Sequence, residues 1–159
     1  MRKYSSEVVA LIKDFFEKDD WKYKFDEENG VFTGGVDIGN KLGSVSFYLF
    51  VKDDCVLNAT TMKLRVSEAE RLAVAEYITR ANYAMTLGCF EMDFNDGELR
   101  FRMTRSLNDL RADLDAAARL MMLLPCAMFK KSGDGLLEVM FGMKTPEEAC
   151  KEAESKDDE

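Results

Sequence analysis

The chain has 159 residues, of which 47% are hydrophobic, with 22 basic residues, 30 acidic residues and no histidine. This length and apolar content predict a single folded domain. The net charge of −8 argues against nucleic acid or an anionic membrane as a partner. The absence of histidine excludes Ser-His-Asp and Cys-His catalytic arrangements and every imidazole metal site.

Acidic residues are concentrated near the end of the chain. Residues 145–159 contain seven acids and two lysines, a net charge of −5, which leaves −3 for residues 1–144. We therefore predict one domain over residues 1–144 and an acidic C-terminal tail over residues 145–159. We expect the tail to be a frayed, solvated helix or a disordered segment.

The cysteines and the apolar runs bear on cellular location. No C-x-x-C pair is formed by the four cysteines, Cys55, Cys89, Cys126 and Cys150. This predicts reduced, structural or incidental thiols rather than a zinc or redox centre. The apolar run near the start is too short for a signal peptide, and no later run reaches the length of a membrane span. We expect a soluble, cytoplasmic protein with no cofactor and no metal.

The first elements in chain order are a helix and four strands. Ser5 or Ser6 can cap the helix, whose apolar stripe consists of Val8, Val9, Ile12, Phe15 and Phe16. Strands are predicted in residues 22–26, 31–39, 43–52 and 55–62, with turn residues between them. This order predicts a helix packed on an antiparallel β-meander.

The strongest strand is SVSFYLFV, residues 44–51. Its odd-numbered residues are apolar and form one face, while Ser46, Tyr48 and Phe50 form the other. A strand that is apolar on one face and aromatic on the other is either covered on both sides within the protein or part of a partner surface. We favour internal covering, and keep Tyr48 and Phe50 as candidates for an interaction surface.

A long helix is predicted to begin at Ser67, which forms a capping box with Glu70, and to end at Gly88. One polar residue, Asn82, lies on its apolar face, which otherwise consists of Leu72, Ala75, Ile78 and Met85. No acid, thiol or metal ligand is arranged beside Asn82 in the sequence. We interpret it as a satisfied buried or interfacial amide rather than a catalytic group, and keep it as a candidate interaction residue.

Residues 89–103, CFEMDFNDGELRFRM, predict a hairpin around a two-residue type I′ turn at Asp96-Gly97. That turn would place Glu91 opposite Arg102 and Asp93 opposite Arg100 on one face, with an apolar opposite face. Carboxylates with arginines opposite them are poor candidates for general acid/base catalysis. These two pairs are interpreted as structural.

A last helix is predicted from a repeating stripe at spacings of three and four, Leu107, Leu110, Leu114, Ala117, Met121 and Leu124. We interpret the stripe as core packing rather than a coiled coil. Pro125 is expected to kink or restart the helix, and Gly133-Asp134-Gly135 to weaken it. The whole order, α-β-β-β-β-α-β-β-α, predicts an α+β fold with a mostly antiparallel sheet of about six strands and helices on one face.

Two stretches resemble a known family: RANYAMTLGCFEMDFNDGELRFR, residues 80–102, and FGMKTPEEA, residues 141–149. Both resemble the bacterial YbjN family, described as sensory-transduction regulators and similar in fold to the type III secretion chaperones. The resemblance implies a type III secretion chaperone-like fold and a homodimer that binds a protein client. It implies no catalytic residue and does not identify the client.

Two classes of function stay open. The first is a non-enzymatic, homodimeric protein-binding module with a chaperone-like or regulatory role, which could take a client as an added strand or as an amphipathic segment in a groove. The alternative is a small-ligand or metal-binding protein, or an enzyme, with a carboxylate and thiol site at Asp53-Asp54-Cys55. We interpret that cluster as a turn, because neighbouring strand residues point to opposite faces. The glycines form no nucleotide-binding motif.

Overall fold

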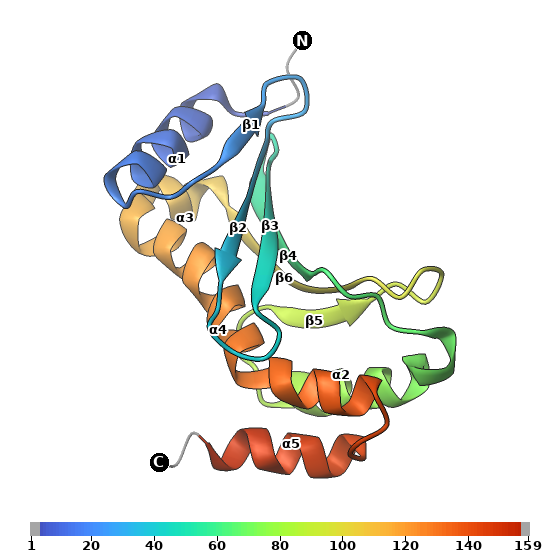
Figure 1. Cartoon of the computed structure of the whole chain (residues 1–159). Helices are drawn as coiled ribbons and strands as arrows, with labels where there is room; N and C mark the ends of the chain where they lie inside the picture. Colours follow the sequence, from blue (N-terminus) through green and yellow to red (C-terminus); the bar gives the residue numbers. More distant parts are fainter. Residues whose placement is uncertain (1–3, 157–159) are drawn as a thin grey trace.

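The computed structural model describes residues 4–156, in which six strands form one antiparallel sheet (Figure 1). The predicted α+β class and the predicted order of elements are confirmed. The elements are α1 (Ser6–Lys18), β1 (Lys24–Asp26), β2 (Val31–Asp37), β3 (Ser44–Val51), β4 (Cys55–Met62), the short 3-10 helix η1 (Glu68–Glu70), α2 (Arg71–Tyr83), β5 (Cys89–Met92), β6 (Leu99–Ser106), α3 (Leu107–Ala112), α4 (Leu114–Met140) and α5 (Pro146–Ser155).

The strands lie in the order β1-β2-β3-β4-β6-β5, and every neighbouring pair is antiparallel. Helices α1, α3 and α4 lie on one side of the strands, α2 and α5 pack below, and the other side of β3 and β4 is open over residues 4–156 (Figure 1). The core therefore lies between one face of the sheet and the helices. This face buries Val45, Phe47, Leu49 and Val51 of β3.

Helix α1 forms as predicted. The Ser5 hydroxyl accepts a hydrogen bond from the Val8 amide, 3.3 Å away, which satisfies one of the free N–H groups of the first turn. All five residues of the predicted apolar stripe are buried. The Phe16 ring lies 5.4 Å from Phe32 and 5.9 Å from Phe47, centroid to centroid, so aromatic contacts fix α1 on the sheet.

The β5–β6 hairpin forms, but its predicted register is wrong by two residues. Glu91 lies opposite Arg100, and Asp93 does not pair with Arg100. The turn is longer than a two-residue type I′ turn, because the Gly97 amide donates to the Asp93 carbonyl, 2.8 Å away. The Asp93 carboxylate accepts from the Asn95 amide, an Asx-type bond that starts the turn early. A shift of two residues leaves every side chain on its predicted face.

Helix α2 differs from its prediction at both ends and on its buried face. Ser67 makes no side-chain capping bond, η1 precedes the helix, and the helix ends at Tyr83 rather than at Gly88. Its buried residues are Val74, Tyr77 and Ile78, whereas Leu72 is 78% exposed. Tyr77 sets this rotation, because its hydroxyl donates to the Ser132 carbonyl of α4, 3.0 Å away, inside the protein.

The last helical region is divided at Asp113, whose carboxylate caps α4 by accepting from the Ala116 amide. Helix α4 then runs through Pro125 without a break and continues past the two glycines. A Cβ atom on Gly133 would lie 2.7 Å from the Asn40 amide nitrogen, and one on Gly135 would lie 2.5 Å from the Tyr77 hydroxyl. The glycines therefore permit close approach of neighbouring elements rather than weakening the helix.

The tail was predicted to be a frayed, solvated helix or a disordered segment, and residues 146–155 do form a helix, α5, but this helix is docked on the protein rather than solvated on all sides. A capping box between Thr145 and Glu148 starts this helix. Ala149, Cys150 and Ala153 are buried against the rest of the protein, and α5 contacts both α2 and α4. A narrow apolar face among acidic residues is sufficient to dock the helix, while its charged residues stay in solvent.

Candidate protein-interaction surfaces

The open face of the sheet is the first candidate surface, and we define its apolar strip by Val31, Tyr48, Phe50 and Leu57, which are half-buried or exposed. The strand register places Val31, Phe50 and Leu57 in one row across β2, β3 and β4, with Tyr48 beside Ala59 in the next row. Tyr48 is 39% exposed and Phe50 is half-buried. The prediction of internal covering is therefore wrong for Tyr48, because the helices pack on the opposite face.

The same face becomes charged toward β6 and β5. The Glu91 carboxylate accepts from Arg100, 2.5 Å away, and from Arg102, 3.0 Å away. Partial burial opposes ionisation of Glu91, but the hydrogen bonds from Arg102 and Arg100 outweigh it, so the pKa of Glu91 lies below its ordinary value. A carboxylate held ionised between two guanidinium groups fixes strand register and is a poor proton donor at neutral pH.

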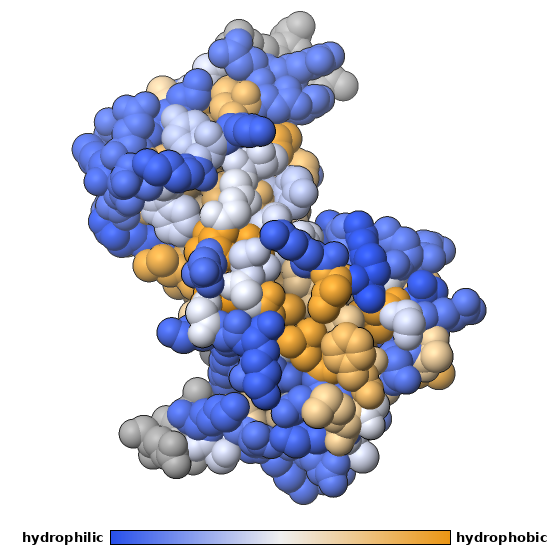
Figure 2. All heavy atoms as spheres, in the orientation of Figure 1, coloured by the Kyte–Doolittle hydropathy of each residue, from blue (hydrophilic) through white to orange (hydrophobic). Residues whose placement is uncertain are grey.

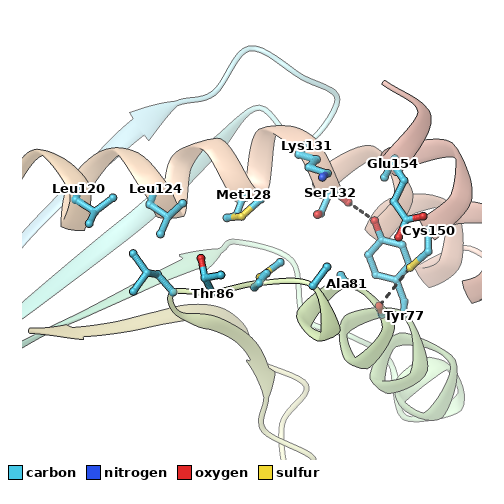
Figure 3. Close-up of a pocket in the computed structure, with 14 residues that line it drawn as sticks. Tyr77, Ala81, Thr86, Leu120, Leu124, Met128, Lys131, Ser132, Cys150 and Glu154 are labelled. Atoms are coloured by element: carbon cyan, nitrogen blue, oxygen red, sulfur yellow. Dashed lines mark hydrogen bonds between the residues drawn. The ribbon is translucent and has the colours of Figure 1, made fainter. Parts of the chain in front are cut away.

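A groove between α2, α4 and α5 is the second candidate surface (Figure 3). It has a volume of about 290 Å³. Leu120, Leu124 and Met128 lie in a row along α4 and point toward the segment that follows α2 (Figure 3). The remaining lining residues are Tyr77, Ala81, Ala84, Met85, Thr86, Leu87, Lys131, Ser132, Cys150, Ala153 and Glu154. The predicted buried face of α2 was wrong, so the sequence analysis did not find this groove. The four-residue spacing of Leu120, Leu124 and Met128 along α4 is the signal in the sequence that could have indicated it.

The polar end of the groove does not resemble a catalytic site. The Cys150 thiol donates a hydrogen bond to the Tyr77 carbonyl, 3.5 Å away. The Tyr77 hydroxyl donates to the Ser132 carbonyl. Burial raises the pKa of Tyr77 and of Cys150 above their ordinary values. Since the thiolate is the reactive form of cysteine, a raised pKa makes Cys150 a weak nucleophile at neutral pH.

Asn82 forms two hydrogen bonds inside the protein. Its side-chain amide donates to the Phe90 carbonyl, and its side-chain oxygen accepts from the Phe90 amide, both at 2.8 Å. The Asn82 side chain thus makes the two backbone hydrogen bonds that a neighbouring strand would make to Phe90 in the edge strand β5. The interpretation as a satisfied amide holds, and the geometry gives Asn82 a structural role in closing this edge of the sheet.

The Asp53-Asp54-Cys55 cluster forms the turn between β3 and β4. The Lys52 amide donates to the Cys55 carbonyl, 2.9 Å away, and the Leu107 amide donates to the Asp54 carbonyl. Burial, reinforced by Asp54, raises the pKa of the Cys55 thiol. All four cysteines are free thiols.

Over the described residues, no three cysteine, aspartate or glutamate side chains are grouped to hold a metal ion. No helix within residues 4–156 has both the length and the hydropathy needed to cross a bilayer. Figure 2 shows apolar residues in a hollow just above the C-terminal half of α4 and α2, within a border of hydrophilic residues. The two candidate surfaces described above, on the sheet and between the helices, are largely apolar.

These features define an α+β protein built on one antiparallel sheet. The model of the YbjN family, described as a putative bacterial sensory transduction regulator, matches residues 9–123. The chain belongs to the YbjN family, which confirms the resemblance found in its sequence. No curated protein and no solved structure matches the chain. The predicted likeness to type III secretion chaperones therefore stays a prediction.

Proposed function

We propose that this chain is a non-enzymatic regulatory protein that acts as a homodimer in the bacterial cytoplasm and binds a protein client. The observation that carries the proposal is the apolar strip on the open face of the sheet, with Tyr48 and Phe50 at its centre. Family membership supports the regulatory part, and free thiols are typical of a reducing compartment.

The chemistry of the strip suggests how a client would bind. The cross-strand row of Val31, Phe50 and Leu57 offers apolar contact, and Tyr48 adds a ring with a hydroxyl group. Aromatic side chains give large contact area at low cost in conformational entropy. Beside this row, Arg102 and Glu91 provide charged groups that can orient a polar part of the client. We infer that the client contributes a short apolar segment.

The edges of the sheet favour binding on its face rather than strand addition. At one edge, Asn82 occupies both backbone hydrogen-bonding groups of Phe90 in β5. At the other edge, β1 has only three residues. An added strand needs a longer row of free backbone groups.

Photo-crosslinking in bacterial cells tests the client surface. A photoreactive phenylalanine derivative is placed at Tyr48, and the control is the same residue at Leu72, which is 78% exposed on α2. We expect crosslinks to a defined set of proteins from position 48, absent from position 72 and lost when Phe50→Ser is added. Equal crosslinking from the two positions, or none from position 48, would contradict the proposal.

A second candidate function is binding of a small apolar ligand in the groove, which its volume of about 290 Å³ favours. Native mass spectrometry of protein purified without a metal-affinity step distinguishes binding of a small ligand from binding of a protein client. A stoichiometric small-molecule adduct that is lost in a Met128→Glu variant would support ligand binding. Protein without an adduct would leave the interaction module as the better account.

A further inference from the structure

Helix α5 closes one end of the groove between α2 and α4. Cys150, Ala153 and Glu154 of α5 line this end, next to Tyr77 of α2 and Ser132 of α4 (Figure 3). Tyr77 and Ser132 are buried there, although both line the groove. Access to this end of the groove therefore depends on the position of α5.

The contact that holds α5 is narrow and is made by small side chains. Its buried residues are Ala149, Cys150 and Ala153, whereas the buried residues of α1 are valines, an isoleucine and phenylalanines. Hydrophobic stabilisation grows with the apolar area buried, so α5 gains much less from its contact than α1 does. The hydrogen bond from the Cys150 thiol to the Tyr77 carbonyl adds little, because a thiol is a weak donor.

The ion pairs of α5 with the rest of the protein are also weak. Arg80 of α2 and Glu147 of α5 lie 3.9 Å apart, and both side chains are about half exposed. Lys144 pairs with Glu138 of α4 at 3.1 Å and with Glu152 of α5. Exposed ion pairs contribute little to stability, because water and salt screen them.

The contact between α2 and α4 does not need α5. The Tyr77 hydroxyl donates to the Ser132 carbonyl of α4 and lies close to Gly135. Val74 and Ile78 of α2 are buried as well, and α2 contacts α4 directly. Segments with few buried apolar contacts open at a lower free energy than the whole fold. By this criterion α5 can detach while α2 and α4 stay together.

We propose that α5 is a lid, which opens as a unit while the rest of the fold stays intact and thereby uncovers the closed end of the groove. The hinge lies in residues 141–145, where Phe141 and Met143 are exposed rather than packed. With the lid open, the groove is open at both ends, so the size of apolar ligand that it accepts depends on α5. This inference goes beyond the proposed function and needs neither the homodimer nor the client surface at Tyr48.

Labelling of native protein with N-ethylmaleimide tests the opening of α5, because peptide mass spectrometry measures Cys150 separately from the other cysteines. The reference is Ala118→Cys, at a buried position on α4. Each rate is divided by the rate for the same peptide in unfolded protein. We expect Cys150 to react at least about tenfold faster than Ala118→Cys, with little dependence on low urea concentrations, because local opening exposes little surface. Equal rates that rise equally with urea would overturn the inference.

A thiol introduced at the closed end tests whether the opening uncovers the groove. Ser132→Cys carries this thiol on α4, and Ala153→Asp opens the lid by placing a carboxylate on the buried side of α5. We expect Ala153→Asp to speed labelling of Cys150 and of Ser132→Cys by at least about tenfold each, because a buried charge without a partner disfavours the closed state. Ser155→Asp, on the exposed side of α5, is the matched control and should change neither rate.

The outcomes separate the two parts of the inference. Faster labelling of Cys150 alone would show that α5 opens without uncovering the groove, and would overturn its role as a lid. If Ser132→Cys fails to fold, the labelling of Cys150 in wild type still decides whether α5 opens on its own. Neither result bears on crosslinking from Tyr48, so failure of this inference leaves the proposed client surface in place.

Discussion

The side-chain amide of Asn58 replaces a hydrogen bond that Pro125 removes from helix α4. Proline has no N–H group, so Pro125 cannot donate to the carbonyl of Met121 four residues earlier. Asn58 is fully buried on β4, and its amide donates to that carbonyl at 2.9 Å. Thr60 donates in turn to the Asn58 side-chain oxygen, 2.7 Å away. The strand and the helix are thus joined by one satisfied polar network.

Replacement of Asn58 tests this relationship. We expect Asn58→Leu to lower the free energy of unfolding by about 2 kcal/mol, because the Met121 carbonyl stays buried without a partner. In a Pro125→Ala background the backbone N–H is restored, so the same substitution should cost about 1 kcal/mol less. Urea unfolding of the four proteins gives the coupling. Thr60→Val is the control, since Pro125→Ala should not rescue it, and additive effects would contradict the relationship.

The contact between Tyr77 and Gly135 gives a second prediction. A methyl group at residue 135 would lie 2.5 Å from the Tyr77 hydroxyl, so Gly135→Ala should destabilise the fold by about 1–3 kcal/mol. Tyr77→Phe removes the clashing oxygen, and Gly135→Ala should therefore cost less in that background. Thermal unfolding measures both, and Gly35→Ala is the control, because its nearest contact would be at 3.8 Å. An equal cost in both backgrounds would refute this steric explanation.

The Glu91 cluster predicts a loss of stability in acid. The pKa of Glu91 is lowered in the folded protein, so its stabilising contribution is present above the unfolded value of about 4.3 and is lost as the pH falls through the lower folded value. Glu91→Gln should therefore show a smaller drop in unfolding free energy between pH 7 and pH 3 than wild type. The exposed Glu28→Gln serves as the control. A drop as large as that of wild type would show that Glu91 contributes little.

Closure of the β5 edge by Asn82 gives a fourth prediction. Asn82→Ala leaves both Phe90 backbone groups without this partner, and should cost about 1–2 kcal/mol. Hydrogen exchange should show faster exchange of the Phe90 amide, while the oligomeric state should not change, because both bonds lie within one chain. Arg80→Ala, on the exposed side of α2, is the comparison. Dissociation of a dimer by Asn82→Ala would instead place Asn82 at an interface.

The sequence alone determined the class of fold, the order of elements, the stripe of α1 and the family. Hydrophobic periodicity and turn residues act locally, so alternation from Val45 to Val51 and the buried positions Val8 to Phe16 were readable from neighbours in sequence. The same reasoning identified the apolar face of the β5–β6 hairpin. It also marked Tyr48 as a candidate, although it favoured internal covering of that side.

Tertiary structure decided what local patterns leave open. The hairpin register depended on an Asx bond at Asp93, and the buried face of α2 depended on Tyr77 reaching α4. The glycines of α4 looked like a weak point until Tyr77 was placed against Gly135. The groove exists only where α2 meets α4 and α5, which come much later in the sequence. Such features arise because hydrogen bonds and close contacts between remote segments outweigh the small preferences of local sequence.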